Sequence, residues 1–206
     1  MSQETLIHQA RGGNTQALEQ LLRQWHPALA GFTRQYFQGR FNAEVSEELM
    51  REAIQGTLIS VHRQLGSLRE VGAFKAWLYR IATHQCYEKE RQWRRRTGRV
   101  IPMGFLKKEQ ENGEEAYALP EPISQEIPVD ERMHQSGLAD QIRAALTQLP
   151  TEQHTVLIMK EYQGLTFREI AEALDLSENT VKSRLYYGLK HLRKNLPQWE
   201  RIRAEM

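Results

Sequence analysis

Residues 98–131 restrict the fold more than any other part of the sequence, because they concentrate residues that interrupt helices. Four of the chain's seven prolines lie in this stretch, at Pro102, Pro120, Pro122 and Pro128. Proline has no backbone N–H, and it disfavours helical geometry in the residue before it. The stretch is also far longer than an ordinary loop. We therefore predict a linker at 98–131 between two domains, at 1–97 and 132–206.

The charge of the chain changes sign at the same boundaries. Residues 1–97 carry fourteen Lys and Arg against nine Asp and Glu, the linker carries three against eight, and residues 132–206 carry eleven against nine. A total of +2 thus hides a basic, acidic, basic order. This order indicates a polyanionic partner for the two outer parts.

Both outer parts have the apolar spacing of helices. Apolar residues recur three or four positions apart in four segments, which begin at Ala17, Leu49, Phe74 and Leu138. Asn14 can cap the first helix, and the last should end before Pro150. No stretch alternates with period two for long enough to be a strand. The predicted fold is all-α, with two small helical domains joined by the acidic linker.

The composition argues against a membrane protein or a secreted, disulfide-bonded one. The longest apolar run, 156–159, is far shorter than the ~20 residues that span a bilayer. The first residues do not have the pattern of a signal peptide. The single cysteine, Cys86, excludes an internal disulfide and continues an apolar helical face, which predicts a buried thiol. We expect a cytoplasmic protein without membrane insertion.

Residues that carry out catalysis are not grouped in recognisable motifs. The seven histidines are scattered, without the spacing of metal ligands. Neither a glycine-rich phosphate loop nor a nucleophile elbow is present. We therefore predict that the protein is not an enzyme and that it has no catalytic residue, metal site or cofactor.

Residues 166–196 have the pattern of a helix-turn-helix. Thr166 and Glu169 form a capping box for a short helix, and Ser177 can cap a longer basic helix after a tight turn at 175–177. The buried face of the second helix centres on Leu185, and polar residues lie opposite it. Hydroxyl, amide and basic side chains can read base edges in a major groove. The candidate DNA contacts are Ser177, Asn179, Thr180, Lys182, Ser183, Arg184, Tyr186, Tyr187 and Lys190.

A second basic region ends the first domain. Five arginines lie in the nine residues 91–99, around Trp93, and upstream residues of the same helix mix aromatic and basic groups. Aromatic and cationic side chains together hold unstacked bases along a charged groove. Phe74 and Trp77, however, have the spacing of core residues. The arginine run alone is also consistent with a solvated surface, or with a contact to the nucleic-acid backbone that does not depend on sequence.

Several of these segments resemble the extracytoplasmic-function (ECF) class of bacterial RNA polymerase sigma factors. Residues 53–63 and the motif F-K-A-W-L-Y-R-I-A at 74–82 resemble the first conserved domain of the class, region 2. Residues 149–153, 161–171 and 176–185 resemble its helix-turn-helix domain, region 4. The helix-turn-helix is shared with many regulators, whereas the 74–82 motif on the same chain is specific.

The resemblance implies a specificity subunit that binds core RNA polymerase and promoter DNA and has no enzymatic activity. The C-terminal domain would read the upstream (−35) element as duplex, and the N-terminal domain would open the downstream (−10) element and hold it as single strand. The residues expected at that strand and its backbone are Arg69, Lys75, Arg80, His84, Arg91, Arg94, Arg95 and Arg96. Those expected to dock on the polymerase are Gln55, Leu58 and His62. An anti-sigma factor is a common partner in the class.

Three positions depart from the usual pattern of the class. Gly56 replaces an acidic residue, His84 replaces an asparagine that helps to read the downstream element, and Tyr186 and Tyr187 occupy a commonly basic position. Two other classes of protein are the alternatives. A stand-alone helix-turn-helix regulator should dimerise on half-sites, and the chain has no obvious dimerisation helix. A nucleic-acid-processing enzyme needs a metal or acid–base cluster.

Overall fold

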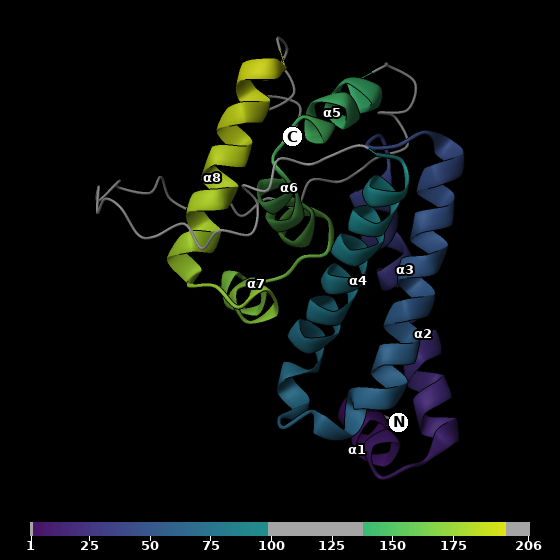
Figure 1. Ribbon diagram of the computed structural model, residues 1–206. Coiled ribbons are helices and arrows are strands. Elements are labelled where there is room, and N and C mark those ends of the chain that lie inside the picture. Colours follow the sequence, from purple (N-terminus) through teal and green to yellow (C-terminus); the bar gives the residue numbers. More distant parts are fainter. Residues whose placement is uncertain (1, 99–137, 197–206) are drawn as a thin grey trace.

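The computed structural model describes residues 2–98 and 138–196, which form the N-terminal half and the C-terminal half of the molecule (Figure 1). Almost all of the predicted linker therefore lies outside the described residues, and its boundaries stay a prediction. No β-strand occurs in the described residues, where the nearest feature is an isolated bridge between Gln38 and Phe41. The all-α prediction is confirmed.

The N-terminal half consists of α1 (Gln3–Arg11), α2 (Thr15–Phe37), α3 (Ala43–Gln64) and α4 (Phe74–Arg96). Two single 3₁₀ turns, η1 (Leu65–Ser67) and η2 (Val71–Ala73), connect α3 to α4. The predicted cap is present, because the Asn14 side chain accepts a hydrogen bond from the Ala17 N–H at 3.0 Å. The three long helices lie side by side, with α1 across one end (Figure 1).

Large apolar side chains fill the space between these helices. Leu21, Phe32, Leu49 and Leu78 are fully buried, and so is Cys86, as its spacing predicted. Burying each large side chain contributes about 1.5–3 kcal/mol. Burial also raises the pKa of the Cys86 thiol well above its usual value, so this cysteine is held in the unreactive thiol form.

The C-terminal half consists of α5 (Leu138–Thr147), α6 (Thr151–Leu157), the π-helical turn η5 (Ile158–Tyr162), α7 (Phe167–Leu174) and α8 (Glu178–Asn195). The helix expected before Pro150 is therefore present. Among the described residues, no helix is both long enough and apolar enough to cross a bilayer.

The two halves pack against each other and share one continuous core. Buried residues of the C-terminal half, among them Ile158, Met159 and Leu165, belong to the same apolar cluster as Phe32 and Tyr79. The contact runs mainly between α4 and α7 and between α2 and η5. Helix α8 lies on the far side of α6 from α4 (Figure 1).

Candidate nucleic-acid interface

The helix-turn-helix forms as its local signals predicted. Thr166 Oγ1 accepts from the Glu169 N–H at 3.2 Å, and the Glu169 carboxylate accepts from the Thr166 N–H at 2.7 Å. Asp175 ends α7 in the left-handed conformation, at φ 56°, and Ser177 then caps α8 by accepting from the Thr180 N–H at 3.1 Å. These contacts fix the angle at which α8 leaves α7.

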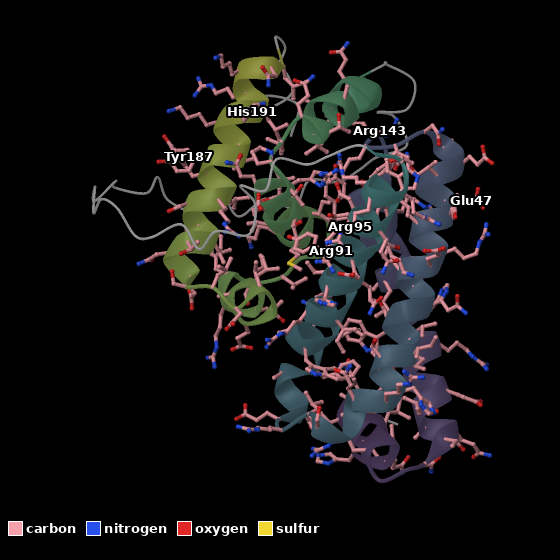
Figure 2. All side chains as sticks on the ribbon, in the orientation of Figure 1. Glu47, Arg91, Arg95, Arg143, Tyr187 and His191 are labelled. Carbon is pink, nitrogen blue, oxygen red and sulfur yellow. The ribbon has the colours of Figure 1, made fainter. Side chains whose placement is uncertain are left out.

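The outer face of α8 is exposed along its length. Val181, Leu185 and Leu192 are buried, whereas Asn179 and Ser183 on the opposite stripe are exposed. The other residues predicted to contact DNA differ in exposure. Those that are exposed are Ser177, Tyr186, Tyr187 and Lys190, and those that are half-buried are Thr180, Lys182 and Arg184. Figure 2 shows Tyr187 and His191 pointing away from the rest of the molecule. The rings of Tyr186 and Tyr187 contact each other edge to face at 5.5 Å, which gives α8 a rigid aromatic patch where the class commonly has charge.

A pair of ammonium groups lies over the ring of Phe167, the first residue of α7. Lys182 Nζ lies 5.7 Å from the centre of the Phe167 ring, and Lys160 Nζ from η5 lies 5.1 Å from the same centre. Cations are attracted to the negative face of an aromatic ring. Lys160 was not predicted from the sequence, because its contact with Phe167 depends on the π-helical turn and no spacing rule indicates it.

The arginines that end α4 have three different environments. Arg91 pairs with Glu88 at 2.6 Å, and hydrogen bonding by this arginine lowers the pKa of the Glu88 carboxyl. Arg94 donates to the buried Glu90 from both Nε (3.0 Å) and Nη2 (2.6 Å), and its guanidinium lies over the Phe41 ring. Arg95 and Arg96 are exposed, and neither forms an ion pair within the described residues.

The beginning of α4 and the turns before it line an open cavity of about 280 Å³. Its lining residues are Leu68, Arg69, Glu70, Ala73, Ala76, Trp77, Arg80 and, from α7, Glu172. Two guanidinium groups and an indole can together hold a planar, electronegative group. Of the other residues predicted for the single strand, His84 is exposed and lies outside this cavity, and Lys75 pairs with Glu169 of α7 at 3.3 Å.

The predicted docking residues lie on α3. Gln55 and His62 are exposed, whereas Leu58 is half-buried and packs on the core. Ile59, which the sequence analysis did not select, is 44% exposed and lies one turn from Gln55 on the same face. The exposed apolar side chain was the signal that could have identified it. Gly56 instead faces α4, where an added Cβ would clash with Gln85 Oε1.

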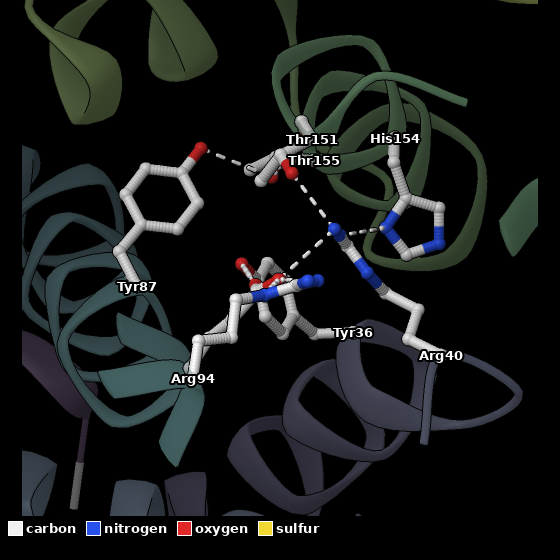
Figure 3. A network of polar contacts seen from close by, with 8 residues as sticks. Tyr36, Arg40, Tyr87, Arg94, Thr151, His154 and Thr155 are labelled. Carbon is white, nitrogen blue, oxygen red and sulfur yellow. Dashed lines mark hydrogen bonds and ion pairs between the residues drawn. The ribbon is translucent and has the colours of Figure 1, made fainter. Parts of the chain in front are cut away.

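A buried polar network joins the two halves (Figure 3). Glu90 accepts from the Tyr36 hydroxyl at 2.5 Å and from Arg40 Nη2 at 3.2 Å. The same Arg40 nitrogen donates to Thr151 Oγ1 at 2.7 Å, and its Nη1 lies 3.5 Å from His154 Nδ1. We call these five residues the inter-half network.

Burial sets the protonation states in this network. It raises the pKa of Tyr36 well above the usual value, an effect that Glu90 increases, so the hydroxyl stays a donor. Burial, helped by Arg40, lowers the pKa of His154 to about 3, so the imidazole is neutral. Since arginine only donates, His154 Nδ1 accepts and Nε2 carries the proton.

Comparison with known proteins identifies the family. The model of sigma-70 region 2 matches residues 21–99, and the model of sigma-70 region 4 matches residues 139–192. The ECF RNA polymerase sigma factor SigX of Bacillus subtilis is 31% identical over 161 residues, which are 78% of this chain and 74% of SigX. The chain belongs to the ECF class of RNA polymerase sigma factors. SigM of Mycobacterium tuberculosis (strain H37Rv) is 28% identical over 172 residues, 84% of this sigma factor and 73% of SigM.

Two solved structures have a similar fold. CnrH, solved with the cytosolic domain of CnrY, superposes with a TM-score of 0.59 at 20% identity and covers 93% of this sigma factor and 94% of that chain. RpoE of Bartonella quintana, solved with the anti-sigma factor NepR, gives 0.58 at 19% identity and covers 86% and 94%. The relatives are transcription-initiation factors, a class that is not generally enzymatic. Within the described residues, no cluster of His, Cys, Asp and Glu could hold a metal ion.

Proposed function

We propose that this sigma factor directs core RNA polymerase to promoters by two separate DNA contacts, one in each of the domains predicted at 1–97 and 132–206. The C-terminal domain reads an upstream (−35) duplex with the outer face of α8, and the N-terminal domain holds the downstream (−10) element as single strand against α4. The observation that carries this proposal is the exposed polar stripe of α8, held at a fixed angle by two capped helices. An acidic linker at 98–131 would follow a path lined by the polymerase.

The upstream contact is supported by the chemistry of α8. Asn179 and Ser183 can hydrogen-bond to base edges, and the rings of Tyr186 and Tyr187 can contact thymine methyl groups. The N-terminus of α8 presents free N–H groups to a phosphate. Lys160 and Lys182 add two positive charges at the junction with α7, where the duplex backbone would pass.

The downstream contact is supported by the cavity at the start of α4. Extruding a base from the stack costs a few kcal/mol, which stacking on Trp77 and contacts with Arg69 and Arg80 would offset. His84 lies further along α4 and would face the neighbouring bases. The exposed Arg95 and Arg96 would contact phosphates without regard to sequence.

The polymerase contact is supported by the exposed face of α3. Gln55, Ile59 and His62 form a patch of one apolar side chain between two polar ones. CnrH and RpoE were each solved with a partner protein, and an anti-sigma factor would be a partner of this chain as well. Co-purification with the tagged protein would reveal core polymerase and any such partner as separate bands.

Transcription with purified core polymerase tests the proposal. Linear templates that carry genomic promoters should give specific transcripts only when the sigma factor is added. A template opened beforehand at the downstream element should reduce the need for the α4 contact but not for the α8 contact. Absence of initiation from every promoter tested would refute the proposal.

A further inference from the structure

The interior of α3 contains a glycine that makes room for a side chain of the neighbouring helix. Gly56 lies well inside α3, where glycine is the least favourable residue apart from proline. An added Cβ would clash with the amide of Gln85 from α4, and the atoms nearest to it all belong to that side chain. Gly31 inside α2 differs, because a Cβ there would meet only Gln163 Nε2 at an ordinary contact distance. Gly56 therefore accommodates one particular residue.

The Gln85 amide lies across α3 in a defined orientation. Its Nε2 donates to Ser60 Oγ at 3.3 Å, and Ser60 lies one turn after Gly56. One turn after Gln85, Lys89 pairs with Glu52 of α3 at 3.2 Å. These contacts hold α3 and α4 side by side (Figure 1). Because Ser60 takes the donor end of the amide, the acceptor end, Oε1, is the one that lies over Gly56.

This acceptor is open to a partner. Gln85 Oε1 accepts no hydrogen bond within the described residues, and it is not shut off from solvent. An amide oxygen can accept two hydrogen bonds. Gln55 and Ile59 directly precede Gly56 and Ser60, and both are exposed. A free acceptor thus borders the exposed apolar side chain of Ile59.

The pairing of Gly56 with Gln85 stabilises the fold less than simpler residues would. Alanine at both positions would favour helix at 56 and would lose only one hydrogen bond at a half-buried place. Local choices that give up stability in this way are typical of functional sites. A free acceptor beside an apolar side chain fits a protein surface that offers a hydrogen-bond donor and an apolar contact.

We propose that Gln85 extends the polymerase-docking patch of α3 onto α4, and that its Oε1 accepts a hydrogen bond from core RNA polymerase. The patch on α3 consists of Gln55, Ile59 and His62, and the amide adjoins it. The inference rests on the proposed polymerase contact and adds to it a residue of the neighbouring helix. Because His84 beside it is expected at the single strand, the experiment has to separate polymerase from DNA.

Substitutions at both positions test this arrangement in the whole chain. Gln85→Ala removes the acceptor, whereas Gly56→Ala keeps it but displaces it from α3. The double variant combines the two. The controls make the same chemical changes on α2, with Gln20→Ala at an exposed position and Gly31→Ala where a methyl group has room.

Two affinities are measured for each chain. Biolayer interferometry gives the Kd for purified core polymerase, and fluorescence anisotropy gives the Kd for a labelled single-stranded oligonucleotide. Loss of one neutral hydrogen bond should raise the core Kd of Gln85→Ala about fivefold. Gly56→Ala should raise it by a similar factor although its helix is not destabilised. The double variant should match Gln85→Ala, because the methyl group then displaces nothing. Both controls, and all single-strand affinities, should equal those of the parent.

Three results would overturn the inference. One is an unchanged core Kd in Gln85→Ala. Another is a double variant in which the two effects add, because the methyl group would then obstruct the polymerase directly. The third is weaker single-strand binding by Gln85→Ala at unchanged core affinity, which would place the amide at DNA. If the parent itself did not bind core polymerase, the proposed function would fail instead.

Discussion

Adjacent arginines at the end of α4 differ in what they can contribute. Arg95 is exposed and free of ion pairs within the described residues, so Arg95→Ala should weaken binding to all sequences alike and lower the salt slope by about one unit. Arg94 bonds to buried Glu90, so Arg94→Ala should instead lower the free energy of unfolding by about 1–3 kcal/mol. Salt titrations of binding and urea denaturation separate the two. A change of sequence preference in Arg95→Ala would contradict a backbone contact.

Ser183 and Lys182 are expected to read bases, and Lys160 offers a matched comparison. Ser183→Ala and Lys182→Ala should each weaken upstream duplex binding by about 1–3 kcal/mol and relax preference at one position. Lys160→Ala removes the same charge from the same Phe167 ring but lies outside α8, so it should weaken all duplexes equally. Binding to a panel of single-base variants measures this. If Lys182→Ala weakened binding to all the duplexes equally, Lys182 would be a contact to the DNA backbone and not to a base.

The contacts of a residue could be predicted from the sequence only where its partner lies within about one helical turn along the chain. The caps at Asn14, Thr166 and Ser177 were predicted because each bonds to a residue three positions away. The bond of Arg94 to Glu90 lies one turn away and was open to the same reasoning. The contact of Arg94 with Phe41 was not, because Phe41 lies between α2 and α3 and only the folded chain brings it to the end of α4.

At the level of helices, the apolar repeats located α2, α3, α4 and α5 and described their limits less well, whereas α1 and α6 were not predicted. The repeat from Ala17 to Trp25 predicted the start of α2, but the helix continues through Pro27 to Phe37. Burial of Leu29, Phe32 and Tyr36 offsets the missing hydrogen bond of an exposed proline. The π-helical turn η5 has no periodic signature, and it places Gln163 against Tyr79.

The crossing of α3 and α4 gives a test of element packing. Gln85 lies across Gly56 and donates to Ser60 Oγ at 3.3 Å. In a Gln85→Ala background, Gly56→Ala should stabilise the fold by about 1 kcal/mol, because alanine favours helix. In the parent the gain should be smaller, since the new methyl displaces Gln85 and its hydrogen bond. Urea denaturation of the four chains measures this coupling, and equal effects in both backgrounds would contradict the close approach.

At the scale of the whole molecule, the docking of the halves was not predictable from the sequence. The hydrogen bonds that join them link residues from 68 positions apart, as for Tyr87 and Thr155, to 114 positions apart, as for Arg40 and His154, and no local pattern indicates such pairs. The division at 98–131 was predicted from composition, and the same reasoning suggested two independent domains. The shared core and the inter-half network show instead that the described halves form one packed body.

Acid should weaken the docking of the two halves through His154. This imidazole faces Arg40 and the Tyr36 ring, and Arg40 in turn bonds to Glu90. The pKa of His154 is lowered to about 3 in the docked chain, whereas an imidazole in water titrates near 6.5. When the halves are apart, His154 is in water, so below pH 6.5 this open state binds more protons than the docked state. Docking is fully stable above that pH and weakens as the pH falls from 6.5 towards 3. At pH 5 the loss reaches about 2 kcal/mol.

Energy transfer between dyes on Glu47→Cys in α3 and Asn195→Cys in α8 measures this loss directly, and the native Cys86 is buried and does not take label. In the parent, transfer should fall between pH 7 and pH 5. His154→Gln keeps a neutral side chain that can accept from Arg40 and removes the titration, so its transfer should stay level. The exposed histidines His62 and His84 are present in both chains and cancel in the comparison. Equal pH slopes in parent and variant would assign the effect to another group, and the inter-half network would then be a fixed contact that pH does not regulate.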